Sequence, residues 1–162
     1  ATVGPDGAPS SRWVLLRGLS ADGLTFFSHD DGPKGLAIAH EPRVAAGFWW
    51  PSLERQVRVT GRCAPVPFEE SDAYWASRPR SSRIASAASP QSREIPSREW
   101  LEREIAAFDE RFPGEVPRPE RWVGFRIVPT AIEFWQGRPS RAHDRILFRR
   151  ENDGWSWSRL SP

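Results

Sequence analysis

Apolar and polar residues alternate over much of the chain, and this pattern predicts a protein built mainly from β-strands. In residues 56–64, Val57 and Val59 alternate with Arg58 and Thr60, which is the period of a strand with one exposed face. Similar runs predict further strands over residues 12–17, 24–28, 44–50, 122–128, 131–135, 145–150 and 155–159. Turns that contain Gly or Pro separate neighbouring runs and join them as hairpins.

Other segments have the spacing of helices. A short helix is predicted over residues 34–40, after Pro33, and a second over residues 67–77. The longest helix begins after the N-cap Ser97 and places four apolar side chains on one face: Leu101, Ile105, Phe108 and Phe112. Residues 77–93 are rich in Ser, Ala and Arg, and this composition predicts a flexible linker or a mobile ligand loop.

These elements predict a single domain over residues 1–162, since a chain of 162 residues is long enough for one core. About seven strands, mostly in antiparallel hairpins, with two or three inserted helices predict a closed or nearly closed Greek-key β-barrel. Closure is expected because it removes exposed strand edges. The sequence contains no methionine, so we expect a further N-terminal segment before residue 1.

Composition limits the kinds of ligand and location. The 23 basic and 21 acidic residues give a net charge of +2, which does not predict a nucleic-acid-binding protein. All the basic residues except Lys34 are arginine, whose planar guanidinium suits phosphate and carboxylate ligands. One cysteine, Cys63, and three scattered histidines predict neither an intrachain disulfide nor a metal site. No apolar run has the length of a membrane span, so a soluble cytoplasmic protein is expected.

Four groups of cations are candidate anion sites, and the first two lie near the N-terminus. Arg12 and Arg17 are five residues apart on a predicted strand, so they would point to opposite faces and serve two anions. Lys34 would lie at a helix start, where free backbone N–H groups and the helix dipole favour a phosphate. The alternative for Lys34 is a solvated side chain.

The third group follows the second predicted helix, where Tyr74, Arg78 and Ser82 would face one anion if the helix continued past Pro79. The alternative is a solvated loop. The fourth group is residues 133–145, which contain three arginines, a histidine and a tryptophan beside a predicted strand end. This stretch is either a polar hairpin connection or a site where an aromatic ring and several cations meet a planar anion.

Six short motifs follow one another along the chain: Arg12-Trp13-Val14-Leu15-Leu16-Arg17, Glu54-Arg55-Gln56-Val57, Ser77-Arg78-Pro79-Arg80-Ser81-Ser82, Gln91-Ser92, Glu133-Phe134-Trp135-Gln136-Gly137 and Arg141-Ala142-His143-Asp144-Arg145. In this order they resemble the pyridoxine/pyridoxamine 5′-phosphate oxidase family. The resemblance runs to the end of the chain and implies an FMN-binding split β-barrel that forms a homodimer, with FMN at the subunit interface. The Pro33-Lys34-Gly35 form of the loop at the predicted helix start also resembles the phenazine-biosynthesis branch of this fold.

The resemblance implies roles for individual positions. It assigns FMN contacts to Arg12, Trp13, Val14, Leu15, Leu16, Arg17, Phe27, Ser28, Lys34, Gln56, Gln91, Ser92, Trp135 and Arg145. It assigns the phosphate of a pyridoxal-type substrate to Arg17, Tyr74, Arg78 and Ser82. The catalytic residues Arg141 and His143 would lie against the substrate ring.

The implied reaction is that of an FMN-dependent oxidase acting on pyridoxamine or pyridoxine 5′-phosphate. A hydride would pass from substrate C4′ to flavin N5, with O₂ as the final acceptor and H₂O₂ as a product. One alternative is an FMN oxidase of a phenazine-type or other secondary-metabolite precursor, and another is a non-catalytic flavin- or haem-binding split barrel. Arg17 stands where the family typically has lysine, and Gly32-Pro33 stands where it has Ser-Arg, which predicts weaker FMN retention.

Overall fold

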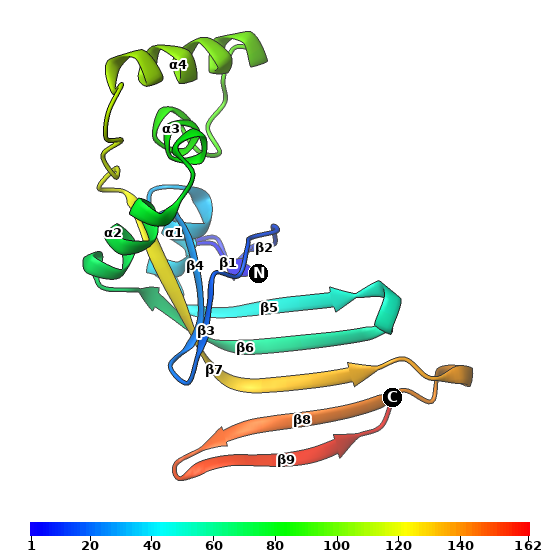
Figure 1. Cartoon of the computed structure of the whole chain (residues 1–162). Helices are drawn as coiled ribbons and strands as arrows, with labels where there is room; N and C mark the ends of the chain where they lie inside the picture. Colours follow the sequence, from blue (N-terminus) through cyan, green and yellow to red (C-terminus); the bar gives the residue numbers. More distant parts are fainter.

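A curled seven-stranded sheet is the main feature of the computed structural model, which describes residues 1–162. The strand order is β3-β4-β7-β6-β5, and β8 and β9 continue the sheet from the second half of β7 (Figure 1). The bounds are β3 Gly18–Ser20, β4 Gly23–His29, β5 Arg43–Trp50, β6 Arg55–Pro65, β7 Trp122–Gln136, β8 Asp144–Glu151 and β9 Gly154–Leu160. All pairings are antiparallel, so the predicted mainly β fold is confirmed.

Shorter elements complete the chain. A separate N-terminal hairpin is formed by β1 Thr2–Val3 and β2 Pro9–Ser10. The α-helices are α1 Pro33–His40, α2 Phe68–Ser77, α3 Arg80–Ala88 and α4 Arg98–Arg111, and the 3₁₀ turns are η1 Pro51–Leu53 and η2 Pro139–Arg141. Helices α2, α3 and α4 all lie between β6 and β7 in the sequence and gather near the start of β7 (Figure 1). No helix has the length and apolar character needed to cross a membrane.

Strand β7 belongs to both halves of the sheet. Its first residues pair with β4, as in Leu24 opposite Ile127, and its last residues pair with β8, as in Trp135 opposite Arg145. Strand β6 accompanies it along most of its length, with a bulge between Thr60 and Gly61. A Cβ atom at Gly61 would lie 2.3 Å from a carbonyl oxygen of β7, so glycine is required where the two strands change direction together.

Two apolar clusters hold these elements. The larger lies between the strands and α1 and includes Phe125, Val59 and Ile38, each at most 4% exposed. The smaller joins the helices to the start of β7 and consists of Trp75, Ile84, Val116 and Trp122 with several half-buried neighbours. Because Ile84 is buried in this second cluster, α3 is fixed against the sheet.

Most predicted elements are confirmed, and their bounds differ from the predicted ones by at most one residue. Ser97 is the N-cap of α4, since its Oγ accepts a hydrogen bond from the backbone N of Trp100 at 3.2 Å. The apolar face of α4 is only half-buried, although Ile105 and Phe108 do pack against the smaller cluster. The runs 122–128 and 131–135 form one strand rather than two, because β6 pairs with both.

Two predictions are wrong. Residues 12–17 are not a strand: Arg17 donates its backbone N–H to Thr25 at 2.8 Å, but the segment before it leaves the sheet and Trp13 is 88% exposed. Residues 77–93 are not a linker, because they contain α3. Pro79 interrupts the helix after Ser77, and the chain restarts as a helix one residue later because Ile84 enters the smaller cluster.

Candidate functional site

A pocket between β4, α2 and α3 gathers three cations, and we call it the anion pocket. The cations are Arg17, Lys34 and Arg78, and no carboxylate is among the lining residues. The other lining residues are Trp13, Val14, Leu15, Phe27, Ser28, Tyr74, Ser86, Gln91 and Trp122. Positive charge without a neutralising acid, surrounded by aromatic walls, suits an anionic ligand that also has a flat ring.

Arg78 is the most constrained of the three cations. Its guanidinium lies 5.1 Å from the ring centroid of Trp75 and 4.9 Å from that of Trp122. Its Nη2 donates to Ser86 Oγ at 2.8 Å, whereas its Nη1 is buried without a hydrogen-bond partner. Burial lowers the pKa of Arg78 from its ordinary value. A buried donor without a partner is costly, so this nitrogen is suited to an incoming acceptor.

Tyr74 stands beside Arg78 in the pocket wall. Its ring stacks on Phe27 with centroids 4.0 Å apart, and Arg17 lies 5.8 Å above the same ring. The sequence placed Tyr74 and Arg78 one turn apart on a continuous helix. The structure brings them together although the helix ends at Ser77.

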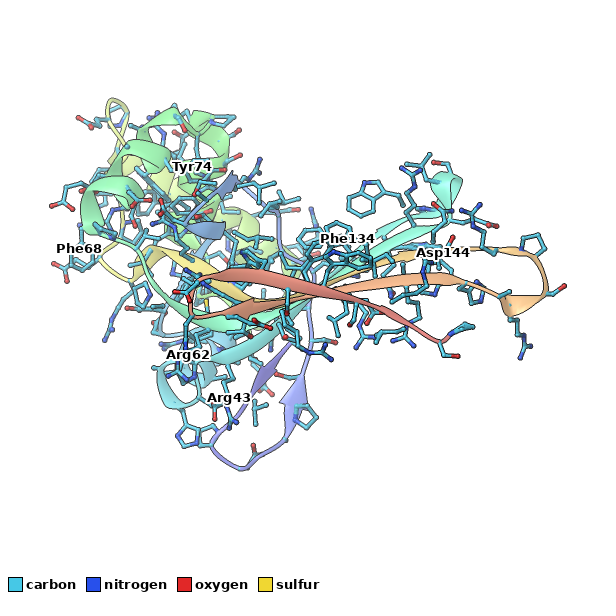
Figure 2. All side chains as sticks on the ribbon, turned by 90° about the horizontal axis from the view of Figure 1, so that it is seen from below. Arg43, Arg62, Phe68, Tyr74, Phe134 and Asp144 are labelled. Carbon is cyan, nitrogen blue, oxygen red and sulfur yellow. The ribbon has the colours of Figure 1, made fainter.

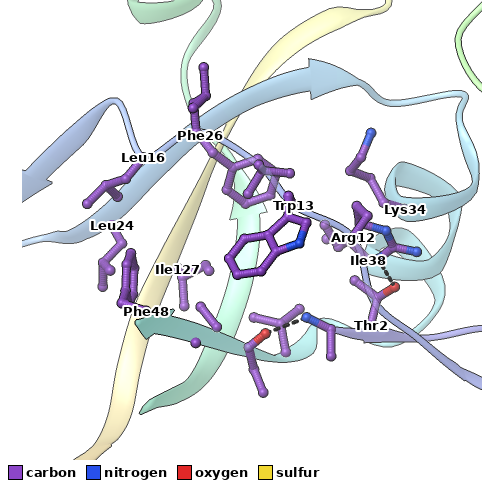
Figure 3. A pocket seen from close by; sticks show the side chains of 17 residues that line it. Thr2, Arg12, Trp13, Leu16, Leu24, Phe26, Lys34, Ile38, Phe48 and Ile127 are labelled. Atoms are coloured by element: carbon purple, nitrogen blue, oxygen red, sulfur yellow. Dashed lines mark hydrogen bonds between the residues drawn. The ribbon is translucent and has the colours of Figure 1, made fainter. Parts of the chain in front are cut away.

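Lys34 begins a second polar group, which we call the Lys34 cluster. Its Nζ donates to Gln91 Oε1 at 2.7 Å and to Ser28 Oγ, and Ser28 Oγ also donates to Gln91 at 2.8 Å. Arg12 lies on the same side of the molecule, held by Thr2 Oγ1 and Ser10 Oγ at 2.7 Å each (Figure 3). Burial, and then the charge of Arg12, lowers the pKa of Lys34. Two cations that repel each other are stabilised by an anion placed between them.

An apolar pocket adjoins the Lys34 cluster. Trp13 lies in the middle of it, with Phe26 and Ile127 on one side and Arg12 and Lys34 on the side of α1 (Figure 3). Thirteen of its 17 lining residues are hydrophobic, including Val14, Leu15 and Leu16. A cation pair beside an apolar wall fits FMN, which combines a phosphate with a flat ring system.

The remaining predicted residues lie on the second half of the sheet. The register places Gln56 opposite Trp135 and Trp135 opposite Arg145, so the three side chains share one face, and we call them the distal row. Arg145 donates from Nε to Glu133 Oε1 at 2.8 Å and from Nη1 to the Ser161 carbonyl at 3.0 Å. Glu133 is only 7% exposed, and the hydrogen bond from Arg145 lowers its pKa.

Arg141 and His143 follow the distal row in the connection to β8. The rings of His143 and Trp135 are 4.6 Å apart, and His143 Nδ1 accepts the backbone N–H of Arg138 at 3.1 Å. Because Nδ1 is an acceptor, the neutral ring carries its proton on Nε2. Ser140 and Arg141 both have left-handed backbones, with φ of 58° and 61°, a conformation that costs energy in residues other than glycine.

The two groups of predicted residues do not meet within one chain. Tyr74 and Asp144, which mark the anion pocket and the end of the distal row, lie at opposite ends of the long sheet (Figure 2). None of Gln56, Trp135 and Arg145 lines the anion pocket or the apolar pocket. The structure therefore presents two half-sites.

Two residues that the resemblance assigns to ligands, Ser82 and Ser92, do not line the anion pocket, whereas Ser86, one turn after Ser82 on α3, does. The ligand contacts of Ser82 and Ser92 stay predictions. Ser92 is exposed, with φ of 63°. The sequence assigned no role to Glu133 beyond its place in a motif. In the structure, its carboxylate contacts both Arg145 and Arg58. The serine spacing would have indicated Ser86 if residues 80–88 had been predicted as a helix.

Comparisons with known proteins cover both half-sites. The family described as pyridoxamine 5′-phosphate oxidase matches residues 1–112, and the family described as the pyridoxine 5′-phosphate oxidase C-terminal dimerisation region matches residues 122–162. A pyridoxine/pyridoxamine 5′-phosphate oxidase of Cupriavidus pinatubonensis is 55% identical over all of this chain and 77% of its own length. One from Chromobacterium violaceum is 53% identical over all of this chain and 76% of its length.

Solved structures have the same fold. PhzG from Burkholderia lata 383, in complex with tetrahydrophenazine-1-carboxylic acid, superposes with a TM-score of 0.93 at 29% identity, over 99% of this chain and 79% of its own. A pyridoxamine 5′-phosphate oxidase-related, FMN-binding protein from Nostoc punctiforme has a TM-score of 0.80 at 20% identity, over 99% and 85%. The fold is therefore the predicted split barrel.

Proposed function

Because the chain belongs to the pyridoxine/pyridoxamine 5′-phosphate oxidase family, an FMN-dependent oxidoreductase family, we propose that it oxidises pyridoxamine or pyridoxine 5′-phosphate to pyridoxal 5′-phosphate. O₂ is the electron acceptor and H₂O₂ a product in both cases; with pyridoxamine 5′-phosphate, water hydrolyses the oxidised amine and ammonia is released as well. The observation that carries this proposal is the anion pocket, which is lined by Lys34, Ser28 and Gln91 of the Lys34 cluster together with Arg17 and Arg78. Two neighbouring groups of cations, without a carboxylate in the pocket, are what a phosphorylated cofactor and a phosphorylated substrate require together.

Each group has a role in this proposal. The FMN phosphate is bound by Lys34, Arg12, Ser28 and Gln91. The segment from Trp13 to Leu16 packs against the flavin ring. Arg78, Arg17 and Tyr74 bind the substrate phosphate, which gives the orphan Nη1 of Arg78 an acceptor. Bound FMN supplies the two-electron acceptor for oxidation at C4′. The chain itself fixes the substrate ring so that C4′ faces the cofactor.

In this proposal, Arg141 and His143 contact the substrate ring. A second copy of the chain must supply these two residues to the anion pocket. They lie with the distal row, at the opposite end of the sheet from the anion pocket (Figure 2). The family region that matches residues 122–162 is a dimerisation region, which supports a homodimer. We infer that FMN lies at the subunit interface, between one protomer's Lys34 cluster and its partner's distal row. His143 Nε2–H and the Arg141 guanidinium then donate to the substrate ring substituents.

Turnover by the purified protein tests the function. We expect a yellow, FMN-loaded protein that converts pyridoxamine or pyridoxine 5′-phosphate and releases equimolar pyridoxal 5′-phosphate and H₂O₂. The likeness to PhzG at 29% identity favours a second candidate, oxidation of a reduced tricyclic acid of the phenazine type. Bound flavin with turnover of tetrahydrophenazine-1-carboxylic acid, and of neither B6 phosphate, would replace the first proposal by the second.

Mixed dimers test the shared site. Arg78→Met and Arg141→Ala each disable one half-site, so each homodimer is expected to show little activity when assayed at a substrate concentration well below the KM of the unmodified protein. Random mixing of equal amounts makes half of the dimers hybrid, and each hybrid has one site with both halves intact. Activity should therefore recover to about a quarter of that of the unmodified dimer. Hybrids confirmed by mass spectrometry that stay inactive would show that each site lies within one chain.

A further inference from the structure

Ser86 connects the anion pocket to β4, the strand that carries Ser28 of the Lys34 cluster. Its Oγ accepts Arg78 Nη2 at 2.8 Å, and its carbonyl oxygen accepts His29 Nε2 at 3.0 Å. His29 ends β4, directly after Ser28. Burial lowers the pKa of His29, which favours the neutral ring that donates through Nε2. Ser86 is thus held at its backbone and presents its hydroxyl to the pocket.

The hydroxyl of Ser86 has an unused donor. A serine oxygen accepts up to two hydrogen bonds and donates one. Here Arg78 uses an acceptor position, so the O–H proton is available to a ligand, and no carboxylate lines the pocket to take it. The buried Nη1 of Arg78 also has no partner. Two neighbouring donors of the anion pocket, one charged and one neutral, therefore have no acceptor within the protein.

Ser82 provides an internal comparison. It lies four residues earlier on α3 and so on the same helix face, but only Ser86 lines the pocket and contacts Arg78. Helix α2 ends at Ser77 and α3 begins at Arg80, so Tyr74, Arg78 and Ser82 do not lie on one continuous helix. Their spacing of four residues therefore does not place Ser82 on the same face as Tyr74.

We propose that Ser86 binds the substrate phosphate through its hydroxyl and positions the Arg78 guanidinium for the same phosphate. This inference rests on the proposed function and adds a residue that sets the preference for a phosphorylated substrate. Ser86 accepts from Arg78 Nη2, which keeps the guanidinium plane fixed over Trp122 and leaves Nη1 for a phosphate oxygen. The Ser86 O–H donates to a second phosphate oxygen.

The test compares Ser86→Ala with Ser81→Ala, an exposed serine of α3 that does not line the anion pocket, in the FMN-loaded dimer. For Ser86→Ala we expect KM for the phosphorylated substrate to rise about tenfold, because one hydrogen bond to a charged group is lost. The value of kcat should change less than about twofold. The inhibition constant of inorganic phosphate should rise by the same factor, while FMN affinity and Tm stay unchanged. Ser86→Thr, which keeps the hydroxyl, should restore most of the KM.

Each outcome separates this inference from the proposed function. Unchanged KM and phosphate inhibition in Ser86→Ala, or an equal effect in Ser81→Ala, would overturn it. If the unmodified protein turned over neither B6 phosphate, the proposed function would fail. Calorimetric titration of the FMN-loaded protein with inorganic phosphate would still decide the role of Ser86, because weaker binding to Ser86→Ala than to Ser81→Ala supports it and equal binding refutes it.

Discussion

Replacing Arg78 with methionine is expected to lower kcat/KM for pyridoxamine 5′-phosphate about a hundredfold, mostly through KM, because more than one charge-assisted hydrogen bond to the phosphate is lost. Methionine keeps much of the apolar volume against Trp75 and Trp122, so the smaller cluster stays packed. Steady-state kinetics with varied substrate concentration measures the effect. The rate with unphosphorylated pyridoxamine should change little, since that substrate offers no phosphate.

Arg121→Met is the matched control for Arg78→Met. Arg121 is a largely exposed arginine paired with Asp30, and it does not line the anion pocket. The control should keep the kinetics of the unmodified protein. Arg78→Met that loses activity equally on phosphorylated and unphosphorylated substrates would assign Arg78 to the fold rather than to the phosphate.

Replacing Glu133 with glutamine is expected to weaken FMN binding at least tenfold, measured by quenching of flavin fluorescence during titration. The carboxylate accepts the Nε–H of Arg145 and faces Arg58 at 3.3 Å, so it holds Arg145 in the distal row. Glutamine keeps the shape but removes the charge, and its NH₂ group repels a neighbouring guanidinium. In Arg58→Gln, the more exposed of the two arginine partners is removed and FMN affinity should change much less.

The same pair gives a pH dependence. The folded-state pKa of Glu133 lies below its ordinary value of 4.5, mainly because Arg145 donates to the carboxylate. The pair therefore stabilises the folded protein fully above the unfolded-state pKa, and this contribution is lost as pH falls through the lowered pKa. FMN release during acid titration should follow that loss in the unmodified protein and be shallower in Glu133→Gln. Identical acid profiles would contradict the role of Glu133.

Local sequence patterns were sufficient to predict a strand or helix where one face of the element is clearly apolar. Val57 and Val59 predicted β6, and the Ser97 cap predicted the start of α4. They failed at α3, where the Ser- and Arg-rich composition resembles a linker and the helix depends on Ile84 packing against distant residues such as Trp122. Burial by residues far along the chain is not visible in a local pattern.

The candidate site shows the same division. The family motifs named most of the residues, but their grouping depends on strand register. Gln56 and Trp135 are 79 positions apart and become neighbours only because β6 and β7 pair. Likewise, the sequence did not distinguish Ser82 from Ser86, since that choice depends on where a helix restarts after Pro79. Contacts of high sequence separation set this geometry.

The placement of α2, α3 and α4 has a consequence for how substrate preference changes among such proteins. These helices form one insertion whose ends meet where Pro65 of β6 pairs with Phe125 of β7. Doubling the length of a flexible segment between two such fixed ends costs only about 0.6 kcal/mol. The helices that carry Tyr74, Arg78 and Ser86 can therefore be exchanged or lengthened as a module, while the strands that carry the distal row keep their register. The substrate-side residues can thereby vary without a change in the distal row, provided that Gln91, which lies in the same insertion, keeps its contacts with Lys34 and Ser28.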